Sequence, residues 1–262
     1  MEFGLKDKVA IVSASSKGIG RAVALELASE GCKLAICARS KKELLKTHKD
    51  IEKRGVEVYS QQIDITNISE LKDFVAKTRE ELGSIDILVT NAGGPPPGTF
   101  GKLTAADWKK SIDLNLMSVV RLCRLVLPDM KKKKWGRIVN LTSISVKEPI
   151  DNLLLSNTLR PGVVGFSKTL SREVGAFNIT VNCVAPGYTA TERLKELADA
   201  MGKKRKAKAD KIMKEWSSNV PLGRLGGPKE IADVVVFLCS EPASYVSGTT
   251  IQVDGGMTRS LL

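Results

Sequence analysis

The sequence predicts an α/β fold in which one doubly wound parallel sheet is covered by helices on both faces. Three observations lead to this prediction: short apolar runs rich in Val and Ile recur along the chain, amphipathic stretches of helical length separate them, and no repeat or Pro/Ser linker interrupts the 262 residues. Strands and helices that alternate in this way require parallel pairing through right-handed crossovers. We therefore predict a single domain over residues 1–262.

Seven apolar runs are expected to form the strands of this sheet. They do not alternate strictly between apolar and polar residues, which is typical of strands buried on both faces. The runs lie at Val9–Val12, Leu34–Cys37, Val56–Gln61, Ile85–Val89, Gly136–Leu141, Ile179–Val184 and Thr249–Val253.

Six amphipathic stretches between these runs are expected to form helices, because their apolar residues recur at helical spacing. They span residues 18–30, 41–54, 68–82, 105–132, 152–177 and 229–240. Ligands of such sheets bind at the carboxyl ends of the strands. Functional residues are therefore expected just after each strand.

The chain has a net charge of +12, from 41 Lys and Arg residues against 29 Asp and Glu residues. Much of the excess lies in two segments, residues 202–215 and 130–137. Such local runs indicate a solvated helix face or a mobile flap, with a docking surface for an acidic partner as the alternative. Binding to nucleic acid is the weakest explanation, and we expect no such partner.

The chain has no apolar run as long as the roughly 18 residues that span a membrane, and its start does not resemble a signal peptide. We therefore expect no membrane partner and a cytoplasmic location. The five cysteines are far apart and form no CxxC pair, so they are expected to be reduced. The one histidine, His48, lies beside Lys49 on a predicted surface helix, and no metal site is expected.

The turn after the first predicted strand has the composition of a dinucleotide site. Small residues there allow the backbone to approach a pyrophosphate, and the helix that follows offers free N–H groups and a positive dipole end. Two glycines in a loop are a weak signal alone, and an ordinary strand–helix turn is the alternative. The candidate cofactor residues of this turn are Ser13, Ser15, Ser16, Lys17, Gly18 and Ile19.

The end of the second predicted strand favours NADP over NAD. An NAD site commonly has an acid there to hold the ribose 2′-hydroxyl, whereas a 2′-phosphate needs positive charge. The sequence at this point is Ala38-Arg39-Ser40, and Lys17 can reach the same corner. Charge-assisted hydrogen bonds from Arg39 and Lys17 would hold the phosphate. The alternative is that both are ordinary surface cations.

Further motifs follow the later strands, and together with the Ser13–Gly20 turn they resemble the short-chain dehydrogenase/reductase superfamily over essentially the whole chain. Within it, the sequence is most similar to the 3-oxoacyl-(acyl carrier protein) reductase branch. The motifs are Asp64-Ile65, Asn91-Ala92-Gly93, Asn115, Ser143, Pro186-Gly187 and Asp254-Gly255-Gly256.

The resemblance implies a complete cofactor site at these motifs. Asp64 and Ile65 would frame the adenine, and Asn91, Ala92 and Gly93 would line the adjacent ribose. Pro186, Gly187 and Thr189 would hold the nicotinamide carboxamide. One departure is Ala14, where the family's turn usually has Gly; a methyl group is the smallest possible intrusion and is expected to be tolerated.

The resemblance also implies an active site of Asn, Ser, Tyr and Lys. Asn115 and Ser143 match this pattern, but the Tyr position is Ser156 and the Lys position is Arg160. A serine hydroxyl is a much weaker acid than a phenol with a pKa of about 10, so Ser156 is expected to polarise a carbonyl and to be a poor proton source.

The other three residues keep definite roles in this reading. Ser143 is expected to donate a hydrogen bond to the substrate oxygen. Arg160 is expected to supply fixed positive charge and to donate to the nicotinamide ribose hydroxyls, although it cannot relay a proton. Asn115 would anchor a water molecule near the proton path.

A replacement acid would have to come from elsewhere in the chain. Tyr188 stands at the entrance to the implied nicotinamide pocket, and the alternatives for it are contact with the substrate and simple packing. The family pattern implies a helical flap over the substrate at about residues 188–217. Its expected apolar face consists of Leu194, Leu197, Ile212, Met213 and Trp216.

Two functions from different classes remain open. The first is an NADP(H)-dependent oxidoreductase that exchanges hydride with a carbonyl or alcohol substrate. A 3-oxoacyl thioester is one candidate for that substrate. The second is a dinucleotide-binding sensor or scaffold of the same fold that has lost proton transfer. The resemblance further implies a homotetramer or homodimer, with the helices at 105–132 and 152–177 around a two-fold axis.

Overall fold

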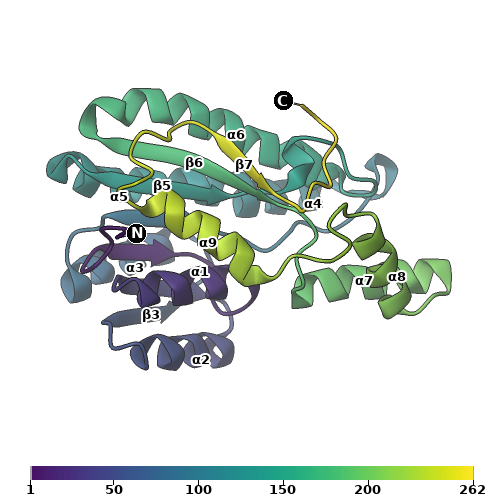
Figure 1. Cartoon of the computed structure of the whole chain (residues 1–262), viewed down its shortest axis with the longest axis horizontal. Helices are drawn as coiled ribbons and strands as arrows, with labels where there is room; N and C mark the ends of the chain where they lie inside the picture. The colour runs from purple at the N-terminus through teal and green to yellow at the C-terminus, as the bar shows by residue number, and fades with distance from the viewer. Residues whose placement is uncertain (1, 262) are drawn as a thin grey trace.

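A computed structural model describes residues 2–261 of the chain, and its strands pair in parallel in the order β3-β2-β1-β4-β5-β6-β7 (Figure 1). The predicted doubly wound α/β fold of Rossmann type is therefore confirmed. The strands are β1 (Val9–Val12), β2 (Lys33–Ala38), β3 (Val58–Gln62), β4 (Ile87–Thr90), β5 (Gly136–Leu141), β6 (Ile179–Pro186) and β7 (Thr250–Val253).

Helices cover both faces of the sheet, as the apolar character of the strands requires. One apolar core lies between the sheet and α1 (Gly18–Ser29), α2 (Lys41–Glu52) and α9 (Pro228–Cys239). The other lies between the sheet and α3 (Ile68–Leu82), α5 (Ser118–Lys133) and α6 (Leu154–Val174). Successive residues of a strand point to opposite faces. In β1, for example, Ala10 and Val12 enter the first core, whereas Val9 and Ile11 enter the second.

The prediction of one continuous α-helix over residues 105–132 is wrong, because a π turn divides it. The structure has α4 (Ala105–Ile112), a turn of π-helix over Asp113–Met117, and then α5. A π turn keeps the chain helical while it rotates the residues that follow, so the apolar pattern alone did not reveal it. Asn115 lies in this turn and is buried.

The flap consists of α7 (Glu192–Arg205) and α8 (Ala209–Ser218), which project together from one end of the molecule (Figure 1). Its apolar residues form a small core of their own, and the five residues predicted for this face all belong to it. Tyr188 stacks on Trp216 with 5.1 Å between ring centroids, so it packs at the base of the flap.

Within residues 2–261, no helix combines the length and the apolar character that a membrane crossing requires.

Candidate active site

A cavity of about 640 Å³ opens at the carboxyl ends of the strands, where the topology predicts a ligand site. The turn after β1, the ends of β2 to β6 and the start of α7 form its walls. Most predicted site residues line it: Ser16, Lys17, Gly18, Ile19, Ala38, Arg39, Ser40, Asp64, Ile65, Asn91, Ala92, Gly93, Ser143, Ser156, Arg160, Pro186, Gly187 and Thr189.

Three predicted residues lie behind the cavity wall. The Ser13 hydroxyl donates to the Asn91 carbonyl oxygen (2.8 Å) and accepts from the Asn91 N–H (2.9 Å). The Ser15 hydroxyl donates to the Val12 carbonyl oxygen (2.9 Å). The Asn115 amide donates to the Gly93 carbonyl oxygen (2.9 Å). These side chains hold the backbone that forms the wall.

The N-terminus of α1 is built for an anion. No side chain caps its first turn and no acidic residue lies in it, so its free N–H groups and positive dipole end are available to a phosphate. A Cβ atom at Gly20 would lie 2.5 Å from Asn91 Nδ2 and 2.6 Å from the Ala14 carbonyl oxygen, so only glycine fits there. These features fit the pyrophosphate of a dinucleotide.

Ala14 fits this turn at a cost that the sequence did not reveal. Its φ angle is 48°, in the left-handed region that glycine adopts freely. An L-residue there costs roughly 1–2 kcal/mol. The cost of Ala14 therefore comes from its backbone conformation. The sequence had suggested a different cost, the intrusion of its methyl group into the ligand space.

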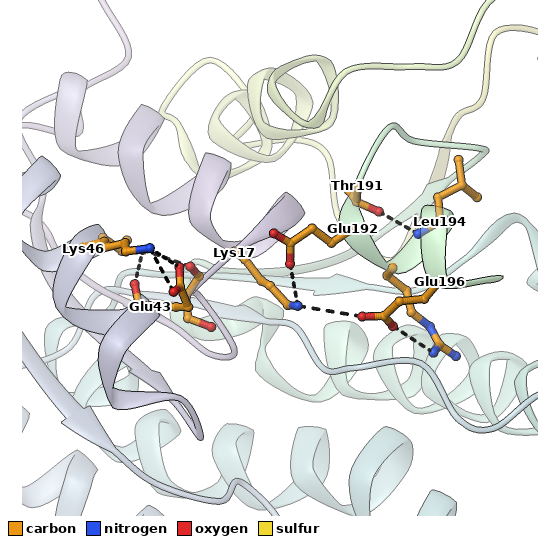
Figure 2. A network of polar contacts seen from close by, with 10 residues as sticks. Lys17, Glu43, Lys46, Thr191, Glu192, Leu194 and Glu196 are labelled. Carbon is orange, nitrogen blue, oxygen red and sulfur yellow. Dashed lines mark hydrogen bonds and ion pairs between the residues drawn. The ribbon is translucent and has the colours of Figure 1, made fainter. Parts of the chain in front are cut away.

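The two cations predicted to share one phosphate differ in their surroundings. Arg39 is exposed, and within the described chain its side chain makes no hydrogen bond or ion pair. Lys17 instead donates to Glu192 of α7 (2.6 Å) and lies 3.9 Å from Glu196, as Figure 2 shows. The hydrogen bond with Glu192 raises the pKa of Lys17, and the same bond lowers the pKa of Glu192. Glu192 of the flap therefore already pairs with Lys17, one of the two cations.

Replacing Glu192 with Gln is expected to strengthen the binding of NADPH. The change removes a negative charge near the expected 2′-phosphate and frees Lys17. Exposed ion pairs contribute about 0–1 kcal/mol, so the gain is expected to be at most about fivefold in Kd, measured by calorimetry. Glu215→Gln is the matched control, because Glu215 pairs with Arg205 (2.7 Å) in the same flap and does not line the cavity. Weaker NADPH binding by Glu192→Gln would contradict this reading.

Serine hydroxyls gather near the carboxyl end of β5, from the segment that follows β5 and from α6. The Ser143 hydroxyl accepts a hydrogen bond from the Ser145 N–H (3.2 Å), which leaves its proton free for a substrate oxygen. The Ser145 and Ser156 hydroxyl oxygens are 3.0 Å apart. Ser145 was not among the predicted site residues. Its position two residues after Ser143 is the feature of the sequence that could have indicated it.

Arg160 lies one helical turn after Ser156 on α6, and its side chain is only 7% exposed. Its Nη1 donates to the Leu141 carbonyl oxygen (2.7 Å), whereas Nε has no partner in residues 2–261. Burial lowers its pKa to about 10, so the guanidinium stays charged at neutral pH. No tyrosine of the described chain lines the cavity. Burial also raises the pKa of Tyr188, which makes its phenol a weaker acid.

Comparisons with known proteins agree with this geometry. Residues 13–258 match the family model described as enoyl-(acyl carrier protein) reductase. The 3-oxoacyl-[acyl-carrier-protein] reductase FabG of Aquifex aeolicus is 34% identical over 98% of this chain and 100% of its own length. FabG of Escherichia coli is 35% identical over 97% of this chain and 99% of its own.

Solved structures of reductases share the fold over nearly their whole length. L-sorbose reductase from Gluconobacter frateurii, complexed with NADPH and L-sorbose, matches with a TM-score of 0.95 at 33% identity and full coverage of both chains. An actinorhodin polyketide ketoreductase variant with NADPH matches with a TM-score of 0.93 at 31% identity, over 96% of this chain and 97% of its own. The chain therefore belongs to the short-chain dehydrogenase/reductase superfamily and is an oxidoreductase of that superfamily.

Proposed function

We propose that this enzyme uses NADP(H) to reduce a carbonyl substrate to an alcohol. The observation that carries the proposal is the cavity itself, which joins an uncapped helix N-terminus and Arg39 at one end to Ser143, Ser156 and Arg160 at the other. Bound NADPH would supply the hydride, and water would supply the proton that completes the alcohol. The solved reductases that share the fold, two of them described with NADPH, support this choice of cofactor.

The chain's own residues divide the cofactor between them. The first turn of α1 would hold the pyrophosphate, and Arg39 with Ser40 would hold the 2′-phosphate. Asp64 and Ile65 would frame the adenine, and Asn91 to Gly93 would line the adjacent ribose. Pro186, Gly187 and Thr189 would hold the nicotinamide carboxamide.

The reacting oxygen of the substrate would be held by hydroxyl groups. The Ser143 hydroxyl would donate a hydrogen bond to the carbonyl oxygen, because its own oxygen already accepts from the Ser145 N–H. Ser156, paired with the Ser145 hydroxyl, donates a second hydrogen bond. Preorganised donors of this kind stabilise the charge that develops on the oxygen. Ser156 and Arg160 stand, on this proposal, in the positions that the superfamily gives to Tyr and Lys.

A second candidate function is a dinucleotide-binding sensor or scaffold with impaired catalysis. The observation in its favour is the chemistry of the cavity lining, which offers serine hydroxyls and a fixed guanidinium as the groups near the reacting oxygen. A serine hydroxyl is a poor proton source, and arginine does not release its proton.

Steady-state oxidation of NADPH separates the two candidates. The substrates are a panel of simple ketones and 3-oxoacyl thioesters, and NADPH affinity is measured in parallel by calorimetry. Turnover of any carbonyl supports the reductase. Tight NADPH binding without turnover of any substrate supports the sensor.

We also propose that the enzyme acts in the cytoplasm as a homodimer or homotetramer. Large apolar side chains are exposed at the first of the two helices expected around the two-fold axis: Ile112 ends α4, and Phe100 lies just before it. Leu222, between α8 and α9, and Tyr245, between α9 and β7, are exposed as well. Light scattering is expected to give two or four times the 28.3 kDa of one chain. A mass near one chain would refute the assembly.

A further inference from the structure

The start of α7 lies at the point where the strand order of the sheet reverses. That reversal falls between β1 and β4, and in sheets of this kind a dinucleotide binds across the crevice there. Four residues from the start of the flap line the cavity, together with the turn that follows β1 and the segment that follows β4. These four are Thr191, Glu192, Arg193 and Glu196.

On the β1 side, the start of the flap contacts the glycine-rich turn. Lys17 Nζ donates to Glu192 Oε2 (2.6 Å) and lies 3.9 Å from Glu196 Oε1 (Figure 2). A Cβ atom built at Gly18 would lie 3.5 Å from Thr191 Cγ2, which is ordinary van der Waals contact. Gly18 is the first residue of α1, whose first turn is the expected pyrophosphate site. The flap therefore begins directly against that site.

On the β4 side, Arg193 reaches the segment that follows β4. Its Nη2 donates to the Pro95 carbonyl oxygen (3.0 Å). Its guanidinium also packs on Gly94, where a Cβ atom would lie 3.3 Å from Arg193 Nε. The proline run at 95–97 fixes the backbone of this wall. The start of α7 therefore bridges the crevice, from the turn after β1 to the segment after β4.

A bridge at this point obstructs the path of a dinucleotide. The proposed site places the adenine near the ends of β2 and β3 and the nicotinamide near the ends of β5 and β6. The narrow pyrophosphate would lie between them, beneath the bridge. Each end of the cofactor carries a ring system that is wider than the pyrophosphate. The bridge must therefore lift before the cofactor can enter or leave.

The flap is built to move as a unit about its base. Its apolar residues form a core that is separate from the two main cores. Backbone hydrogen bonds fasten the base: the Gly226 N–H donates to the Tyr188 carbonyl oxygen (2.9 Å), and the Ala190 N–H donates to the Gly226 carbonyl oxygen (2.8 Å). The ion pair of Lys17 with Glu192 is exposed, and exposed ion pairs contribute little stability. Segments held by such contacts open most readily.

We propose that the start of α7 is a gate over the dinucleotide site, held shut by the Lys17–Glu192 ion pair and the Arg193–Pro95 hydrogen bond. The gate sets the rates at which the cofactor enters and leaves. NADH has no 2′-phosphate to compete with Glu192 for Lys17, so the gate is shut both in the free enzyme and over bound NADH. This inference rests on the proposed cofactor site. It assigns the start of the flap to cofactor exchange, whereas the family pattern places the flap over the substrate.

Stopped-flow fluorescence of NADH tests the gate without any turnover. Association is followed on mixing NADH with enzyme, and dissociation on displacing bound NADH with excess NADP⁺. Glu192→Gln and Arg193→Met are each expected to raise both rate constants by roughly two- to fivefold, the range that one exposed contact contributes. The Kd for NADH should change little, because a contact made equally in the free and the bound enzyme does not change the affinity.

The two variants remove opposite charges, which separates a gate from a simple electrostatic effect. If these side chains acted only as charges beside an anionic cofactor, Glu192→Gln would slow the release of NADH and Arg193→Met would slow its association. That result, or unchanged rates in both variants, overturns the gate while the proposed cofactor site stands. If the wild-type enzyme binds neither NADH nor NADPH, the proposed function fails and the gate fails with it.

Arg205→Met and Glu215→Gln are the matched controls. They break an exposed ion pair of the same kind (2.7 Å), which joins α7 to α8 within the flap. Neither residue lines the cavity, so neither belongs to the bridge. Both controls are expected to leave the two NADH rate constants unchanged. Equal acceleration in the controls would assign the effect to general loosening of the flap and overturn the gate.

Discussion

Replacing Ser143 with Ala is expected to lower the turnover number by about a hundredfold while NADPH affinity stays nearly unchanged. The Ser143 oxygen accepts from the Ser145 N–H, so its proton is directed to the cavity, where the carbonyl oxygen of the substrate would lie. Loss of one preorganised donor to a developing oxyanion typically costs 10²–10³ in rate. The measurement is single-turnover oxidation of NADPH with the best substrate of the carbonyl panel, together with calorimetry of NADPH.

Two further variants show whether this loss is specific to the reacting oxygen. Ser69→Ala removes an exposed hydroxyl outside the cavity and should change neither quantity. Ser145→Ala keeps the backbone N–H that orients Ser143 but removes the hydroxyl partner of Ser156, so a smaller loss is expected. If Ser143→Ala leaves turnover intact, the substrate oxygen does not lie at the end of β5.

Arg39 is expected to carry most of the preference for NADPH over NADH. Wild-type enzyme should bind NADPH at least tenfold more tightly, which corresponds to about 1.4 kcal/mol, and Arg39→Ala should remove most of this difference. One charge-assisted contact can supply that amount. Arg39 is expected to carry the larger share because Lys17 is already paired with Glu192, whereas the Arg39 side chain makes no hydrogen bond or ion pair within residues 2–261.

Calorimetry with both cofactors at low and high salt measures this preference. The preference should fall as salt rises, because Arg39 is exposed and its charge is screened. Arg39→Lys keeps the charge without the bidentate geometry and should give an intermediate value. Lys42→Ala removes a neighbouring exposed cation that does not line the cavity, and it should leave the preference unchanged. Equal affinities of the wild-type enzyme for NADPH and NADH would refute the assignment.

The sequence by itself determined the fold and the outline of the cofactor site. Val/Ile-rich runs alternating with amphipathic stretches predict buried parallel strands, because burial on both faces removes the period of two. The carboxyl ends of parallel strands meet at one edge of the sheet, so residues as distant as Lys17, Arg39 and Ser143 could be assigned to one cavity. Ser156 and Arg160 lie on a helix, and only the resemblance to the superfamily assigned them to the site. These are consequences of local pattern and topology.

Only the tertiary structure decided which side chains face the cavity and which of their charges are already neutralised by an ion pair. Lys17 and Glu192 are 175 residues apart, and no local pattern predicts their pairing. The π turn at Asn115 is also invisible in the apolar pattern, because the chain stays helical through it. The charge of Arg160 is evident from the sequence, but whether it is neutralised depends on every group packed around it. Electrostatic balance is a property of the assembled site, because it depends on groups that are distant in the sequence.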